Sequence, residues 1–197
     1  MNKKSVSATI LVLFLALFFT VVGSCFSAFV YSKTRTLLES VDLVSVEGVE
    51  LFQDKAHKKK ATSLKLSNMD LGLKPATGEI DAESKVPSTI TDKGTSEGYY
   101  ASVYLDARVA FRVVVKNIKI DSTHDEIMVK EERKNIFVAI KDVKNSAKSL
   151  ENDEIELASF SNVETLEKLT FYIWLSSFAT DELEGAKISF TLEFVAI

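Results

Sequence analysis

Apolar and polar residues alternate strictly in the two segments that end the chain. Residues 168–177 place large apolar side chains at every second position, namely Leu169, Phe171, Ile173 and Leu175. Residues 186–197 do the same with Ile188, Phe190, Leu192, Phe194 and Ala196. A period of two residues brings one set of side chains to one face of a β-strand. We therefore predict two long strands in the middle of a sheet core, joined by the polar residues 176–185 as a hairpin or as a connection between sheets.

The same alternation recurs further upstream, in four segments separated by charged loops: 99–105, 109–120, 135–143 and 155–160. In the second of these, Phe111, Val113 and Val115 share one parity, whereas Ile118 and Ile120 have the other. This change of phase at Lys116-Asn117 predicts a β-bulge. Residues 126–129 are predicted to form a short strand or a turn.

About eight strands rich in Val, Ile, Phe and Thr indicate an all-β fold. We predict an antiparallel β-sandwich or jelly roll after a single N-terminal apolar helix. The expected organisation is a targeting or anchoring segment (1–32), an arm with a basic linker (33–60) and a β-sandwich domain (61–197).

The N-terminal segment has the pattern of a membrane-targeting sequence. Lys3 and Lys4 precede an uncharged stretch, 5–32, whose apolar run of about 24 residues is long enough to cross a bilayer. Small residues at 23–25 also fit a signal peptidase site or a lipoprotein box in which Cys25 is acylated. Three outcomes therefore stay open: a cleaved signal peptide, a retained anchor or a lipidated cysteine. In each case the positive charge before the segment favours a C-terminal domain outside the cell.

Residues 34–52 lead from this segment into the domain. Leu37, Leu38 and Val41 fit a short helix, and 41–46 fit a strand, so we expect a helix or an extended arm before the first strand. The basic run 54–60 predicts a solvated loop, or a surface for an anionic polymer or lipid headgroups. The turn-rich residues 75–98 predict a long loop that either contacts a partner or only connects strands.

Composition excludes several functions. The chain has 24 Lys and Arg against 28 Asp and Glu, and a net charge of −4 argues against nucleic acid as a partner. The only cysteine, Cys25, lies in the apolar segment, so we expect no disulfide in the domain. His57 and His124 have no second ligand or nucleophile at a catalytic spacing. We therefore predict a protein that is not an enzyme and that uses no cofactor and no metal.

One set of aromatic residues is a candidate binding face. It consists of Tyr99, Tyr100, Tyr172 and Trp174. On the outer face of a sheet these side chains would form a surface for a glycan or a protein. The alternative is that they pack beneath a loop or against the second sheet.

The two ends of the chain resemble a known family. The C-terminal motif is Thr170-Phe171-Tyr172-Ile173-Trp174-Leu175, an acidic loop with Gly185, and the strand 188–194. The N-terminal motif is Lys3-Lys4, the apolar run and Phe29-Val30-Tyr31-Ser32. Together they resemble the TasA/camelysin-like, alternate-signal exported proteins of Gram-positive bacteria. The resemblance implies a secreted jelly-roll domain that in some members assembles into biofilm matrix fibres.

Fibre assembly has a physical route through strand exchange, in which an arm of one subunit completes the sheet of the next. The expected assembly arm carries Val41, Leu43, Val46, Val49 and Leu51. The alternative is that these residues pair within their own domain. We therefore expect an exported cell-surface structural protein, extracellular or held at the membrane by its N-terminus. A membrane-anchored extracellular binding module for a glycan or protein is the second hypothesis.

Overall fold

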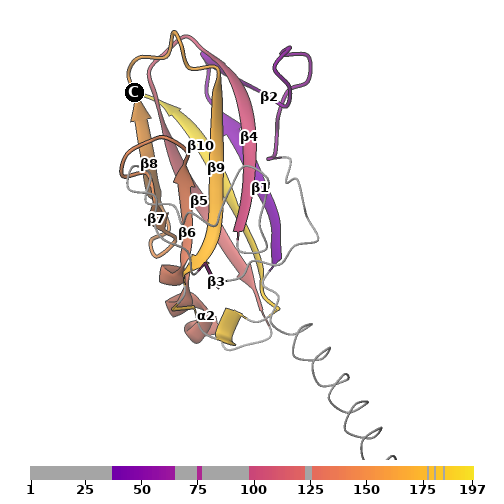
Figure 1. The fold of residues 1–197 in the computed structure, drawn as a ribbon, viewed down its shortest axis with the longest axis vertical. Coiled ribbons are helices and arrows are strands. Elements are labelled where there is room, and N and C mark those ends of the chain that lie inside the picture. Colours follow the sequence, from indigo (N-terminus) through magenta and orange to yellow (C-terminus); the bar gives the residue numbers. More distant parts are fainter. Residues whose placement is uncertain are drawn as a thin grey trace, which may run out of the picture. The chain divides into compact units, whose positions relative to one another are not determined.

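Two β-sheets packed face to face make up the domain (Figure 1). The structure is a computed structural model that describes residues 37–64, 75–76, 98–122, 126–176, 178–179, 181–183 and 185–197. The predicted all-β sandwich is confirmed. One compact unit, Arg35–Ile197, contains both sheets, so the strands that fall in the expected arm belong to the same unit as the rest of the domain.

The first sheet has four strands in the order β1-β10-β5-β8. Their bounds are β1 Leu37–Ser45, β10 Lys187–Ala196, β5 Phe111–Asp121 and β8 Ile155–Phe160. β1 and β10, the first and last strands of the part of the chain that the structure describes, pair in parallel, whereas the other two pairings are antiparallel.

The second sheet has the order β2-β4-β9-β6-β7, with a short β3 alongside the end of β9. The bounds are β2 Val49–Phe52, β3 Pro75–Ala76, β4 Gly98–Ala107, β6 Ile136–Ile140, β7 Lys148–Ser149 and β9 Lys168–Ser176. Because β9 and β10 belong to different sheets, the residues between them form a connection between sheets rather than a hairpin. Both strands are internal in their sheets, as the alternation predicted.

Helical structure is short and gathers at one end of the sandwich (Figure 1). It consists of α2 Glu126–Glu132, η1 Arg133–Asn135 and η2 Asp181–Leu183. The prediction of a strand or turn at 126–129 is wrong. Val129 is buried, while Glu126 and Lys130 occupy the first and last turns, where their charges complement the helix dipole.

Of the two alternatives for Leu37, Leu38 and Val41, a short helix or an extended arm, the helix is wrong and the extended form is present, because these residues lie in the strand β1. β1 pairs with β10 from Leu37↔Lys187 to Ser45↔Phe194. A short isolated helix is marginal in water, whereas pairing with the edge of β10 satisfies one side of the backbone and buries Leu38, Val41 and Leu43.

The bulge predicted in β5 is confirmed. The β10–β5 register shifts between Ser189 and Thr191, which face Lys119 and Lys116. Asn117 has a positive φ of 53°, in the left-handed region that Asn tolerates better than most residues. The extra residue turns Ile118 and Ile120 to the side that faces α2.

Aromatic side chains from both sheets meet in the core. Phe194 of β10 lies 5.7 Å from Phe111 of β5 and 6.5 Å from Phe171 of β9, measured between ring centroids. All three rings are almost fully buried. Phe194 of the last described strand therefore contacts aromatic rings of both sheets.

Several predictions fall on residues that the structure does not describe. The segment 1–32 and most of the loop 75–98 lie outside the described residues, as does His124. In the part of the chain that is described, no helix has both the length and the apolar character needed to cross a membrane.

Candidate functional site

The residues of the expected assembly arm lie at one side of the sandwich, in both sheets. Val41 and Leu43 project from β1 into the core, and Val49 and Leu51 do the same from β2. Val46 is half-buried in the turn between these strands, where the Val49 amide donates to its carbonyl at 3.1 Å. In this single chain the arm therefore pairs within its own domain.

Both hydrogen-bonding edges of β1 are occupied. One edge pairs with β10, and the other receives the segment that follows the basic loop. There the Leu43 amide donates to the carbonyl of Thr62, and the Leu64 amide donates to the carbonyl of Val41, both at 2.9 Å. The same segment bonds to β2, since the Ala61 amide donates to Leu51 at 2.8 Å. Residues 59–64 therefore link the edges of the two sheets on this side.

The candidate aromatic face is divided between two sides of one sheet. Tyr99 points inward and belongs to the main core. Tyr100, Tyr172 and Trp174 form a second cluster with Phe137. These residues belong to the adjacent strands β4, β9 and β6, and the ring of Phe137 stacks on Trp174 at 5.5 Å.

The outward aromatic cluster is mostly covered. Tyr172 is 5% and Trp174 4% exposed, whereas Tyr100 and Phe137 are half-buried. Phe137 was not predicted to belong to this face, although its odd position in a strand that places Ile136, Val138 and Ile140 inward was the signal that could have placed it outward. A partner would therefore meet mainly the edges of Tyr100 and Phe137.

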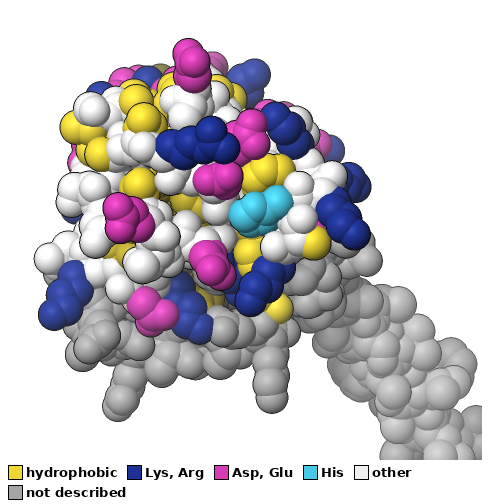
Figure 2. All heavy atoms as spheres, turned by 90° about the horizontal axis from the view of Figure 1, so that it is seen from above, with side chains coloured by type: hydrophobic (Ala, Val, Ile, Leu, Met, Phe, Trp, Pro, Cys, Tyr) yellow, Lys and Arg dark blue, Asp and Glu magenta, His cyan; other side chains and the backbone are white. Residues whose placement is uncertain are grey.

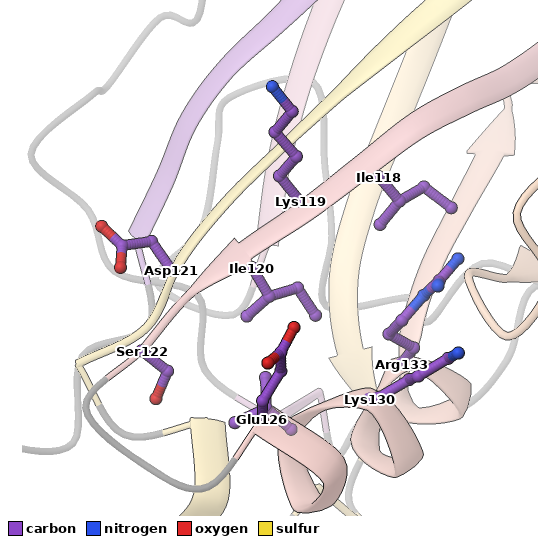
Figure 3. Close-up of a pocket in the computed structure, with 9 residues that line it drawn as sticks. Ile118, Lys119, Ile120, Asp121, Ser122, Glu126, Lys130 and Arg133 are labelled. Atoms are coloured by element: carbon purple, nitrogen blue, oxygen red, sulfur yellow. The ribbon is translucent and has the colours of Figure 1, made fainter.

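A hollow of about 480 Å³ lies between the second half of β5 and α2. It is lined by Ile118, Lys119, Ile120, Asp121, Ser122, Glu126, Val129, Lys130 and Arg133. Figure 3 shows Ile118 and Ile120 on the same side as the helix, whereas the side chains of Lys119 and Asp121 extend away from it. The bulge at Asn117 thus creates the apolar wall of this hollow. The hollow itself could not be predicted from the pattern of β5 or of α2 alone, because it needs both elements.

Arg133 is the most constrained charged residue at the hollow. Its side chain is only 8% exposed. Its guanidinium donates to the carbonyls of Leu150 and Asn152 and to the Asp153 carboxylate, each at 2.8 Å. The hydrogen bond from Arg133 holds the pKa of Asp153 below its usual range. Arg133 thus holds residues 150–153 in place, and most of its N–H donors are already engaged in these hydrogen bonds.

The described residues contain no cluster of three or more His, Cys, Asp or Glu side chains that could hold a metal ion. The basic run 54–60 is an ordered and exposed loop after β2, at the opposite end of β2 from the turn that carries Val46. β1, the main strand of the expected assembly arm, has backbone hydrogen-bond partners along both of its edges.

Comparison with known proteins found no match to any family model, to any curated protein or to any solved structure.

Proposed function

We propose that this protein is an exported cell-surface structural subunit that assembles by exchanging β1 between neighbouring copies. The observation that supports this proposal is the parallel pairing of β1 with β10 at the edge of the first sheet. In an exchanged assembly, β1 of one copy would take the same place against β10 of the next.

The connectivity of β1 favours exchange. Among the described residues, the only covalent connection of β1 to the remainder of the domain is the turn at 46–48. Gly48 in this turn has φ of +91°, and a side chain there would come within 2.9 Å of Val109. Because β1 is the first strand of the described residues, it can leave and be replaced without any other described strand being threaded.

The contacts of β1 are almost the same in the closed monomer and in the exchanged assembly. Leu38, Val41 and Leu43 would fill the same core positions in a neighbour as in their own domain. The hydrogen bonds that β1 makes with Thr62 and Leu64 must also be broken and formed again. Exchange therefore leaves the sum of contacts almost unchanged, so protein concentration and strain in the turn decide the equilibrium.

The test is a disulfide that locks β1. Ser40 and Ser189 are register partners on β1 and β10, so Ser40→Cys with Ser189→Cys in a Cys25→Ser background allows one designed bridge. We expect oxidation of monomers to prevent fibre growth and reduction to restore it. Oxidation of preformed fibres should instead give covalent multimers on a non-reducing gel.

A matched control uses Ser102 and Thr170, register partners on β4 and β9 whose hydroxyl oxygens lie 2.8 Å apart. A bridge there joins two internal strands and should leave assembly unchanged. If oxidised fibres of the Ser40/Ser189 variant contain only monomers with an internal bridge, β1 is not exchanged and the proposal is wrong.

The second candidate function is a membrane-anchored binding module, favoured by the cluster of Tyr100, Phe137, Tyr172 and Trp174 on the outer face of the second sheet. For this function, Tyr100→Ala should abolish capture of a glycan or protein partner and leave the protein monomeric. Tyr99→Ala is unsuitable as a test because Tyr99 belongs to the core.

A further inference from the structure

The basic loop after β2 has a fixed backbone. The Asp54 carboxylate accepts hydrogen bonds from the amides of Ala56 at 2.9 Å, Lys58 at 3.4 Å and Lys59 at 3.1 Å. The Gln53 amide donates to the carbonyl of Lys59 at 2.8 Å, which closes the loop at its base. One acidic side chain therefore organises a loop that otherwise consists largely of lysine.

A ring contact fixes the tip of the loop to the domain. His57 adopts a positive φ of 54°, and its ring stacks on Phe52 with centroids 4.5 Å apart and planes within 5°. Phe52 is itself buried in β2. The loop is thus held both by hydrogen bonds and by stacking.

The side chains that this backbone presents are exposed and basic. Lys55, Lys58 and Lys59 have no acidic partner within salt-bridge distance among the described residues, while Lys60 pairs with Glu50 at 3.3 Å. The seven residues from Asp54 to Lys60 hold four lysines and one aspartate, a net charge of +3. Since the whole chain carries −4, all the other residues together carry −7. Figure 2 shows the histidine side chain on the surface, with both lysine or arginine and acidic side chains around it.

We propose that this loop is a binding site for a linear anionic polymer of sugar or polyol units that bears one carboxylate or phosphate per repeat. Three ammonium groups on a fixed backbone can contact successive charges of such a chain, and the ordered loop lowers the entropy cost of binding. The ligand approaches from solvent, so each contact is weak and the affinity depends on several contacts at once.

The surroundings of the loop favour an anionic sugar or polyol polymer over a lipid bilayer or a nucleic acid. The large hydrophobic residues that are exposed in the described chain, Val44, Val109, Ile127, Phe178 and Ile197, all lie outside the loop, so it has no group to insert into a bilayer. The face of His57 that stacks on Phe52 is unavailable to a nucleobase. The negative charge of the rest of the protein repels a polymer as densely charged as duplex DNA.

The test measures binding of the full-length protein in detergent to polygalacturonate and to poly(glycerol phosphate) at low salt. We expect Lys55→Gln/Lys58→Gln/Lys59→Gln to weaken binding at least tenfold, because the variant removes all three free ammonium groups. The control Lys119→Gln/Lys134→Gln/Lys144→Gln changes the net charge equally at other exposed sites and should bind within twofold of the wild type. An equal loss in both variants would overturn the proposal.

The variant Asp54→Ala distinguishes the contribution of the ordered loop backbone to binding from the contribution of net charge. It removes a negative charge, so a purely electrostatic attraction would become stronger. We expect weaker binding instead, because three backbone amides lose their acceptor and the lysines are no longer held together. Tighter binding by Asp54→Ala, or duplex DNA that binds through these lysines more tightly than either polymer, would overturn the proposal.

Discussion

At the scale of single residues, Arg133 has more partners than any pattern in its own segment suggests. It lies after α2, but the groups that it binds, at Leu150, Asn152 and Asp153, follow 17 to 20 residues later. A buried guanidinium needs such partners, because an unpaired charge in the core is strongly unfavourable. Nothing in the sequence around Arg133 distinguishes it from a surface arginine, so its role could not be predicted.

The pair Arg133–Asp153 predicts a specific dependence of stability on pH. Because the pKa of Asp153 is lowered in the folded protein, its contribution is present above the unfolded pKa of about 3.9 and is lost as pH falls through the lower folded value. Asp153→Asn should therefore lower the free energy of unfolding at pH 7, and the difference from the wild type should shrink below about pH 4. Urea unfolding from pH 7 to 3, with Glu151→Gln as the control, measures this. A constant difference across that range would contradict the prediction.

At the scale of elements, the bulge in β5 shows how one position redirects half a strand. Before Asn117, the residues at odd positions point into the core, and after it Ile118 and Ile120, at even positions, pack against the same core beside α2. The left-handed conformation of Asn117 makes this change possible, and its side chain also donates to Thr191 at 3.4 Å. The hollow beside α2 depends on this one residue.

Substitutions at Asn117 test the bulge directly. Asn117→Val forces a β-branched residue into the left-handed region and should destabilise the domain by about 1–2 kcal/mol. Asn117→Gly removes that strain and should change the stability by less than about 1 kcal/mol. Denaturant midpoints of the two variants measure the difference. Equal losses would mean that the contact with Thr191, rather than the backbone, stabilises the bulge.

At the scale of the whole domain, the first and last strands of the described residues lie side by side in one sheet. β10 lies between β1 and β5, so the last strand pairs with the first, and Phe194 also contacts the opposite sheet through Phe171. Such pairing is nonlocal, because it joins residues that are about 150 positions apart in sequence. The domain should therefore lose both sheets together when this contact is removed.

Phe194→Ala is the test of this coupling. A buried phenylalanine replaced by alanine costs about 3–5 kcal/mol, through lost burial and the cavity left behind. The neighbouring Val195 is half-buried and points to the other face, so Val195→Ala should cost clearly less. Calorimetry should show one cooperative transition at a lower temperature for Phe194→Ala. Two separate transitions would show that the sheets are stable independently.

The sequence alone determined what depends on local alternation. The strands β4, β5, β6, β8, β9 and β10, their inward residues and the bulge were all predictable, because a period of two residues and a change of phase are readable without knowledge of neighbours. The basic character of residues 54–60 was equally clear. At β1 the sequence left a helix and an extended arm open, and pairing with β10 decided between them. At α2 the prediction failed because the helix is too short to show its period.

Only the tertiary structure decided which strands share a sheet and which side chains meet. It paired β1 in parallel with β10, separated Tyr99 from Tyr100, Tyr172 and Trp174, and brought Ile118 and Ile120 opposite α2. It also showed that Asp54 and the stack of His57 on Phe52 order the lysine loop. These features depend on contacts between distant segments or on backbone conformations that alternation does not encode. The physical reason is that hydrophobic alternation specifies the face of a strand but not its partner.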